Sequence, residues 1–498
     1  MPCIRLAFVY FLLLILQGPD VPGQSGNSIR LTVVLPGYPA EELPAKFKRL
    51  GLSSEKAVDV REIESLMENI LRMYEDSGYP FVKARLDTIR ISGSGLRGTV
   101  RIETGERVTI DSILNRTGYR ISQRILSRVT GIQPGDPYSE SAIRSASVRL
   151  SGITWLTQKK QPDIGFHGPY ASLFLYPDKA ASNRFDGWIG LTPAPGSGST
   201  VNFAGALDLG LQNVIGQGES WSVTWRRNQD RSQQLKLGFT IPWLAGLPFG
   251  IQTSLQMYRQ DTSYLNLNLD AGVPYFFSPT NQLNLFYRVK QSNLLTGISM
   301  AESGNNQSYI TRLTGISWNW VRLDRPISPT RGWQFLAEAS IGKKEIEGSK
   351  GISQSEMIAD ASANLSVNQS MVFSLRLRGG ALISSQLLEN ESFRIGGVQD
   401  LRGFDEDIFH SDKFLLGSVE LRYLLDKASY LLLLADYGLL HPVTLSDQPY
   451  KRPLGLGIGG QLKTSGGIFR IIFGLGKEPD APFNLRTGKI HIGYVGLF

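Results

Sequence analysis

Residues 371–378 read Met-Val-Phe-Ser-Leu-Arg-Leu-Arg, and from Phe373 onward every second side chain is apolar while those between are polar. This period of two is typical of a β-strand, whose successive side chains point to opposite faces. One face of this strand is therefore apolar and the other carries arginines. The same alternation recurs at 265–270 and 490–494. From Phe185 to the end of the chain, the sequence predicts strands separated by turns and little helix.

Two architectures fit such a series of strands, a soluble β-sandwich and a transmembrane β-barrel. A sandwich turns its apolar faces inward, whereas a membrane barrel turns them toward lipid and keeps a polar lumen. Residues 182–498 are long for one sandwich, and aromatic residues gather near expected strand ends, as at Trp318, Trp320 and Trp333. We therefore favour a barrel over 182–498. The length alone fits about 14 to 18 strands of ~9–11 membrane residues each.

The N-terminus has the pattern of an export signal. A basic residue precedes an apolar core from Leu6 to Leu16, which is too short to span a membrane. Val21 and Gly23 are small enough to flank a cleavage site, so we predict a signal peptide at 1–23. Cys3 is the one cysteine of the chain, and its removal would leave no thiol or disulfide chemistry. Export without a helical anchor fits an outer-membrane destination.

Residues 24–181 mix helical and strand patterns. Apolar residues recur at three- and four-residue steps from Val60 to Tyr74, which predicts an amphipathic helix that Asp59 caps. The order strand, helix, helix, strand, strand occurs twice, so we predict two α+β units at 24–105 and 106–181. The predicted strands are 29–35, 84–92, 96–103, 107–114, 154–158 and 171–176, and the predicted helices are 41–50, 60–74, 122–129 and 139–150.

Composition and motifs argue against several function classes. The formal charge of +8 is spread over both halves of the 498 residues, which excludes a concentrated nucleic-acid footprint. The four histidines have no metal-ligand spacing, and the acidic run 405–407 is expected to be a solvated loop. Gly455–Gly460 matches a dinucleotide fingerprint by letters but continues as strand. We predict no enzymatic activity, no metal and no cofactor.

A turn-rich segment interrupts the strand pattern before residue 405. It contains Gly396, Gly397, Leu401, Arg402, Gly403 and Phe404. The guanidinium of arginine carries five N–H donors in a rigid fork, so inside a barrel we expect Arg402 to bind a carboxylate. Asp436 is the candidate, because it follows the apolar stretch 431–435 and is not expected to face lipid. The alternative is that Asp436 begins a turn.

These motifs resemble those of the outer-membrane assembly and translocation superfamily typified by BamA and TamA. Leu401–Phe404 is similar to its signature on a loop folded into the barrel lumen, and 435–438 is similar to the strand motif whose Asp pairs with that Arg. Residues 213–219 and 324–332 are similar to its hairpin and turn motifs, and 71–79 and 102–108 to its periplasmic POTRA domains. The resemblance implies two POTRA units, a 16-stranded barrel and an Arg402–Asp436 ion pair.

The resemblance also implies a function, the insertion or assembly of other proteins in a Gram-negative outer membrane. POTRA strands in the periplasm would bind extended client segments through edge pairing. The implied partners are membrane lipid, unfolded outer-membrane or secreted clients, and periplasmic or lipoprotein accessory factors. The barrel would open between its first and last strands. Gly488, Gly493 and Gly496, in a last strand ending at Phe498, would weaken that seam, or they would serve barrel curvature.

Two alternatives remain open at the level of sequence. One is a translocator that exports a single polypeptide through the lumen. Two POTRA units are typical of two-partner secretion translocators, but those also carry a plug helix, for which residues 24–28 leave no room. The other alternative is a passive pore in which the POTRA units are scaffold.

Overall fold

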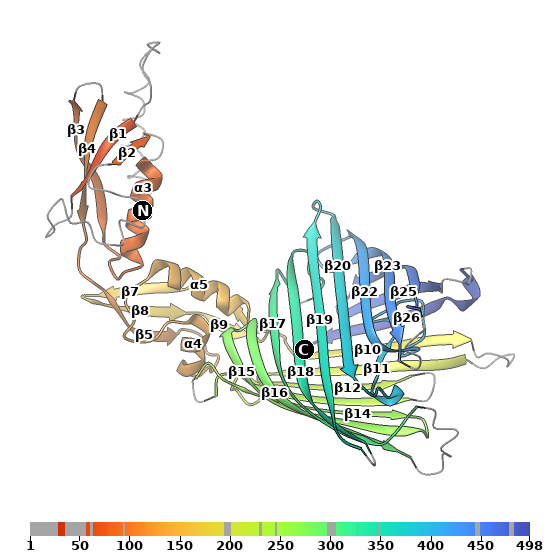
Figure 1. Ribbon diagram of the computed structural model, residues 1–498. Coiled ribbons are helices and arrows are strands. Elements are labelled where there is room, and N and C mark those ends of the chain that lie inside the picture. The colour runs from red at the N-terminus through yellow and green to blue at the C-terminus, as the bar shows by residue number, and fades with distance from the viewer. Residues whose placement is uncertain are drawn as a thin grey trace. The chain divides into compact units, whose positions relative to one another are not determined.

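The computed structural model describes residues 28–34, 56–59, 63–92, 95–193, 201–228, 232–244, 247–295, 305–325, 327–346, 349–443, 449–477 and 483–498 (Figure 1). The predicted signal peptide and the predicted helix at 41–50 lie outside these residues. The chain divides into two compact units. The first comprises 1–112, 134–144 and 164–173, and the second comprises 113–133, 145–163 and 174–498. The predicted domain limits at 105 and 181 remain predictions.

The first α+β segment is a four-stranded mixed sheet with one described helix. Its elements are β1 (Ser28–Val34), β2 (Lys56–Asp59), α3 (Ile63–Glu75), β3 (Lys83–Ser92) and β4 (Gly95–Glu103), in the sheet order β2-β1-β4-β3. Ile63 and Ile70 of the helix pack with Val82, Val100 and Ile102 of the sheet side in one apolar core. Burial of the apolar stripe of α3 against the sheet stabilises both elements.

The predicted cap of this helix is wrong. Residues 56–59 pair with 28–31 as an additional strand, so Asp59 ends β2 rather than capping a helix. The helix begins at Ile63. The reason is tertiary, because β1 offers its edge to a short segment that has no strand periodicity of its own.

The second α+β segment has two helices and five strands. Its elements are β5 (Thr109–Asn115), α4 (Gln123–Thr130), α5 (Glu140–Ser151), β6 (Leu156–Gln158), β7 (Asp163–His167), β8 (Tyr170–Leu175) and β9 (Pro177–Lys179). The strands form a sheet in the order β5-β8-β7 and a separate pair β6-β9. Ser122 caps α4, and Gly131 ends it at a positive φ of 68°. β7 and β9 are short and were not predicted from the sequence.

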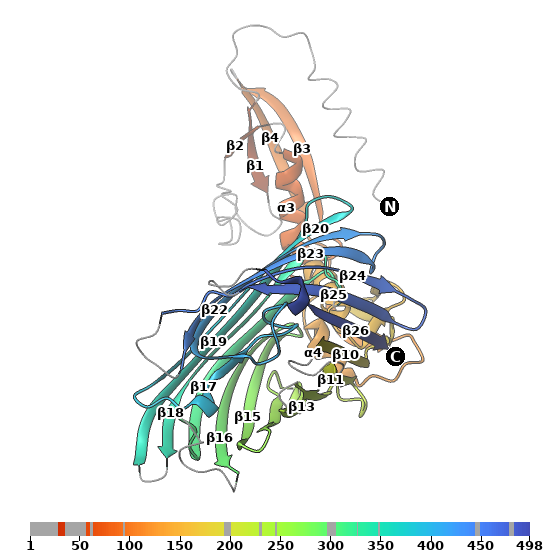
Figure 2. The same ribbon diagram turned by 90° about the vertical axis from the view of Figure 1, so that its right-hand side faces the viewer.

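Sixteen antiparallel strands of the described residues close into a barrel, which confirms the predicted fold class (Figures 1 and 2). They are β10 (Arg184–Pro193), β11 (Val201–Gln212), β12 (Ser220–Arg227), β13 (Gln233–Ile241), β14 (Ile251–Gln260), β15 (Tyr264–Ser278), β16 (Asn281–Leu294), β17 (Tyr309–Leu323), β18 (Gly332–Ile346), β19 (Ser349–Ser366), β20 (Met371–Ser384), β22 (Phe409–Leu424), β23 (Tyr430–Pro442), β24 (Leu454–Lys463), β25 (Ile468–Lys477) and β26 (Lys489–Leu497). Pairing of β10 with β26 closes the wall. Among the described residues, no helix is both long and apolar enough to cross a membrane.

The two faces of the barrel wall differ in polarity as the alternation predicts. On β20, Leu375 and Leu377 are exposed, whereas Arg376 pairs with Asp360 of the neighbouring strand at 2.6 Å. On β23, Leu431 and Leu433 are exposed, whereas Asp436, on the opposite face of the strand, is buried. The outer surface is therefore apolar and the polar side chains turn inward, as in a membrane barrel and unlike a sandwich.

Within the first compact unit, Asp76 after the end of α3 binds the start of α5. Its Oδ1 accepts hydrogen bonds from the backbone N–H of Ser141 at 2.8 Å and from the hydroxyl of Ser139 at 2.9 Å. Partial burial alone would raise the pKa of Asp76, but these hydrogen bonds outweigh it and hold the pKa below its ordinary value. The carboxylate therefore stabilises the N-terminus of α5.

We predict that Asp76→Ala speeds amide hydrogen exchange in the first turn of α5 about fivefold at neutral pH, since loss of a cap costs roughly 1 kcal/mol. The folded pKa is depressed, so the stabilisation is present above the unfolded pKa and is lost as pH falls through the folded pKa. Asp87→Ala is the control, because Asp87 is exposed and pairs with Arg101 at 3.0 Å without contacting a helix end. Equal exchange in both variants would refute the link.

Candidate functional site in the barrel lumen

The segment between β20 and β22, residues 385–408, is here named the lumen loop. It contains the short helix η3 (Glu389–Glu391) and the strand β21 (Phe393–Ile395). Ile395, Leu401 and Phe404 of the loop are buried in one apolar cluster with Phe409, Phe414, Leu416 and Leu440 of the wall. The turn-rich segment found in the sequence thus packs against the inner face of the barrel.

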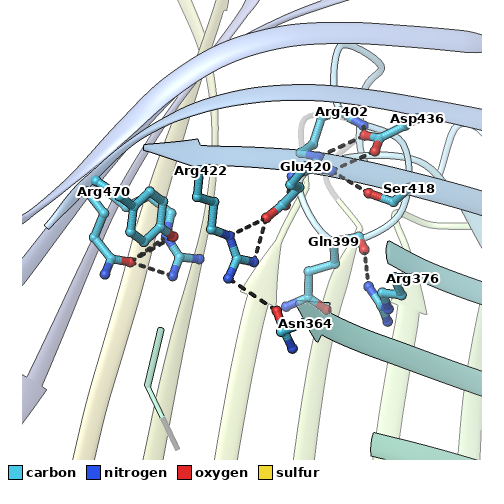
Figure 3. Close-up of polar contacts among 11 residues, drawn as sticks. Asn364, Arg376, Gln399, Arg402, Ser418, Glu420, Arg422, Asp436 and Arg470 are labelled. Carbon is cyan, nitrogen blue, oxygen red and sulfur yellow. Dashed lines mark hydrogen bonds and ion pairs between the residues drawn. The ribbon is translucent and has the colours of Figure 1, made fainter. Parts of the chain in front are cut away.

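Arg402 of the lumen loop binds Asp436 of β23 through two parallel hydrogen bonds (Figure 3). Its Nε lies 2.8 Å from Oδ2 and its Nη2 lies 2.6 Å from Oδ1. The backbone N–H of Arg402 also donates to Asp436, at 3.0 Å. Both residues are buried, with 7% and 1% of their surfaces exposed. Asp436 lies within a strand, so the alternative that it begins a turn is wrong.

Two residues of β22 complete the binding site for the guanidinium. Arg402 Nη1 contacts the carboxylate of Glu420, and Nη2 donates to Ser418 Oγ at 2.6 Å. Glu420 in turn accepts two hydrogen bonds from Arg422 (Figure 3). We name Arg402, Asp436, Glu420 and Ser418 the clamp. Ser418 and Glu420 were not predicted from the sequence, although Ser418, Glu420 and Arg422 at every second position of β22 indicate a polar, inward face.

Glycines on β24 and β25 let the loop backbone lie directly on the wall. A Cβ on Gly455 would lie 2.2 Å from the carbonyl oxygen of Arg402, and one on Gly476 would lie 2.6 Å from that of Gly403. Gly403 itself has a φ of 100°, and a Cβ at this position would lie 2.4 Å from the backbone carbonyl carbon of Leu475. Gly455, the first residue of the run that matches a dinucleotide fingerprint by letters, therefore forms a docking surface for the loop together with Gly474 and Gly476 of β25. A strand glycine often marks such close approach.

The acidic run 405–407 is not a solvated loop, contrary to expectation. Asp405 pairs with Lys489 of β26 at 2.7 Å. Glu406 packs over Gly397, whose φ of 80° and lack of a side chain make room for its carboxyl group. Burial raises the pKa of Glu406 to about 8, although its Oε1 accepts the Val398 N–H at 2.8 Å. The run folds inward because the lumen supplies donors for it.

The start of the lumen loop is fixed to the opposite part of the wall. Lys344 of β18 and Glu391 of η3 form an ion pair at 2.5 Å, and both side chains are fully buried. Asn390 Nδ2 donates to Ser292 Oγ of β16 at 2.7 Å. The guanidinium of Arg394 lies 3.7 Å from the ring centre of Tyr258 on β14. The loop is thus held at both of its ends.

The seam is fully paired in this structure. β10 and β26 pair over eight residues, from Arg184 with Leu497 to Leu191 with Ile490, and backbone hydrogen bonds between Asn183 and Phe498 extend the pairing. Gly493 faces Trp188 and Gly496 faces Phe185 across the seam. Each glycine thus lies opposite an aromatic side chain, an arrangement that compensates in part for the missing side chain.

One predicted seam residue lies elsewhere. Gly488 precedes β26 and follows the short helix η4 (Leu485–Thr487), so it is not part of the last strand. A Cβ at this position would lie 2.5 Å from the ring of Phe473. Its role is therefore close packing at the strand entry and not weak pairing.

We predict that Arg402→Ala releases the tip of the lumen loop while the barrel still forms. Removing the guanidinium takes away the cation that Asp436 binds in a largely dry site, at a cost of roughly 3–5 kcal/mol, whereas Glu420 keeps its hydrogen bonds with Arg422. Limited proteolysis of the purified protein would show cleavage within 396–408, and resistance of the folded barrel to unfolding in mild detergent would be retained. Arg402→Lys should be cut at an intermediate rate, since lysine lacks the bidentate fork. An uncut loop in Arg402→Ala would contradict the clamp.

We predict a similar loop release for Gly455→Ala, with the charged groups intact. The added methyl group overlaps the Arg402 carbonyl, and such overpacking costs about 1–3 kcal/mol. Gly460→Ala on the same strand is the matched control, because its Cβ would come no closer than 3.4 Å to any atom. Equal protease resistance of the two variants would refute the docking surface.

Comparison with known proteins agrees with this geometry. Residues 213–493 match the family model described as the Omp85 superfamily domain. No curated protein sequence matches the chain significantly.

Similar solved structures include BamA from Haemophilus ducreyi lacking POTRA domains 1–3, with a TM-score of 0.53 and 13% identity over 94% of this chain and 100% of that one. CdiB from Acinetobacter baumannii has a TM-score of 0.60 and 13% identity over 99% and 97%. CdiB from Escherichia coli has a TM-score of 0.59 and 15% identity over 99% of both chains. At these identities the likeness is one of fold. Because the family model matches more than half of the residues of this chain, the chain belongs to the Omp85 superfamily of outer-membrane β-barrels.

Proposed function

We propose that this protein inserts or assembles client proteins in the outer membrane, through a barrel wall that opens between β10 and β26. It acts by binding and templating polypeptides and not as an enzyme. The N-terminal α+β segments would serve as periplasmic POTRA domains that bind extended client segments. Among the described residues, their sheets end in strands that have one unpaired edge, such as β7. The backbone groups of such an edge can form hydrogen bonds with an extended segment of almost any sequence.

The observation that carries the proposal is the uneven length of the pairing around the wall. The seam pairs over eight residues, and β25 and β26 over seven. By contrast, β17 and β18 pair over fifteen, and β18 and β19 over fourteen. Because each residue pair adds backbone hydrogen bonds and side-chain contact, the wall separates at lower cost near the seam than on the side of β17–β19. A separated β26 or β10 would offer its edge to a client strand.

The contents of the lumen support a route through the wall over a route along the axis. The clamp fixes the lumen loop by a buried ion pair whose rupture is costly. Near the other end of the barrel, the turn after β17 also reaches inward. Gln461 Nε2 of β24 donates to Ser328 Oγ of that turn at 2.5 Å, and Arg422 of β22 donates to the Pro329 carbonyl at 3.4 Å. A polypeptide or solute moving along the axis would have to displace both segments, which disfavours a passive pore.

Secretion of one polypeptide through the lumen is the second candidate. The presence of two α+β segments favours it, as does the fold similarity to CdiB as well as to BamA. Depletion of the protein, followed by an inventory of outer-membrane and secreted proteins, separates the candidates. Broad loss of barrel proteins supports assembly, whereas loss of a single secreted product supports secretion.

We predict that a disulfide across the seam abolishes client assembly. Ile189 and Ile492 are direct partners that face outward, so Ile189→Cys with Ile492→Cys would lock the wall without entering the lumen. Cys3 is the one natural cysteine, and Cys3→Ser gives a clean background. The matched control is Ile316→Cys with Ala339→Cys, which joins β17 to β18 on the long-stranded side. Reductant should restore function to the seam variant. Normal assembly in the oxidised seam variant would overturn the proposal.

A further inference from the structure

The lumen loop binds the barrel wall on both sides of the seam. On the side of the last strand, Asp405 pairs with Lys489 of β26. On the side of the first strand, the contact is with β12, which β10 and β11 separate from β26 in the closed order. Arg226 Nη2 donates to Gln399 Oε1 at 3.0 Å, and Asn228 Nδ2 donates to Asp407 Oδ2 at 2.6 Å. We name these two hydrogen bonds the latch.

The two attachments differ in strength. The clamp is a buried, bidentate, charge-assisted set of bonds to β22 and β23, and the loop is covalently continuous with β20 and β22. The latch consists of two single hydrogen bonds. The one between Arg226 and Gln399 is exposed to solvent, and the one between Asn228 and the Asp407 carboxylate is partly buried. A single exposed hydrogen bond contributes far less than a buried ion pair does. If β10 and β12 move away from β26, the latch breaks first and the loop stays on β20–β26.

Further contacts hold the tip of the loop on that side. Arg376 of β20 donates to the Gln399 carbonyl at 2.8 Å (Figure 3), and Arg378 of the same strand contacts the Asp400 carboxylate. Gln399 therefore joins β20 through its backbone and β12 through its side chain. Separation of the seam would break the hydrogen bond between the Gln399 side chain and Arg226.

We infer that the latch is a second closure of the lateral seam, made by side chains inside the lumen, and that client insertion requires its release while the clamp stays formed. Arg226, Asn228, Gln399 and Asp407 are positioning residues in this scheme. The inference rests on the proposed function, because it names what must be released before β10 and β26 separate. In this scheme the clamp keeps the loop on β22 and β23, and the latch is the contact that is released.

Weakening the latch should favour opening. Arg226→Gln combined with Asn228→Ala should raise the frequency of large conductance steps in a planar lipid bilayer about tenfold, since two hydrogen bonds are lost. Arg312→Gln is the control, because Arg312 pairs with Glu345 at exposed positions and does not contact the loop. An unchanged frequency, with a normally folded barrel, would overturn the inference.

Fixing the latch should have the opposite effect. In the Cys3→Ser background, Asn228→Cys with Asp407→Cys is joined by a short bifunctional thiol reagent, which ties the loop to β12. The matched control is Asp405→Cys with Lys489→Cys, which ties the loop to the strand on which it stays. We expect loss of large conductance steps and of client assembly in the first pair, and retention of both in the second.

The combination of readouts separates this inference from the proposed function. Loss of conductance steps with normal assembly would show that the latch closes the seam, but it would overturn the requirement for latch release in client insertion and contradict assembly through the seam. Unchanged conductance steps in the joined Asn228 and Asp407 pair would overturn the latch, whatever happens to assembly. Equal loss in both joined pairs would also overturn it, because the loop would then have to leave the last strands as well.

Discussion

A buried guanidinium must be satisfied on all sides, and the burial of Arg402 sets the requirements for much of the C-terminal half of the barrel. An arginine taken out of water without carboxylates would be too costly to keep. Asp436 and Glu420 therefore lie at inward positions of adjacent strands, and Ser418 takes the remaining donor. To bring its fork to these groups, the loop backbone must touch β24 and β25. That contact explains why glycine occupies 455, 474 and 476. One ion pair thus accounts for the path of a loop and for the composition of two strands.

Charged side chains are also paired elsewhere on the inner face of the wall. On the wall away from the clamp, Arg288 of β16 binds Asp270 at 2.7 Å and Glu338 at 2.6 Å, and Lys290 binds Glu356 at 2.5 Å. These charges face inward in alternation with apolar residues that face outward. The two sets cancel in any average along the chain, so the mean hydropathy is −0.11 for a barrel with an apolar exterior. Average polarity is therefore a poor guide to membrane barrels, and the period of two is the informative quantity.

Local periodicity predicted the strands of the barrel and the helix at α3, because the period of an element depends on side chains that are close in sequence. Arg402 and Asp436 could be paired from chemistry and family resemblance alone. Glu420 could not, since a glutamate in a strand is ordinary until its neighbours are known. Likewise, the glycine run of β24 matches a nucleotide motif by letters, and only the approach of the Arg402 carbonyl shows what Gly455 accommodates. β2 was missed because its partner strand, and not its own sequence, makes it a strand.

The points at which the lumen loop is attached determine which part of the barrel wall it restrains. Long strands from β15 to β20 form one continuous side, and the start of the loop is attached there through Glu391 and Asn390. The clamp attaches its tip to β22 and β23, next to the short strands that end at the seam. A loop fixed at both points restrains the part of the wall between them, so deformation concentrates in the strands that it holds least firmly. Those strands are β10–β13, whose neighbouring pairs extend over eight to ten residues. The same buried arginine that fills the lumen therefore directs movement toward the seam.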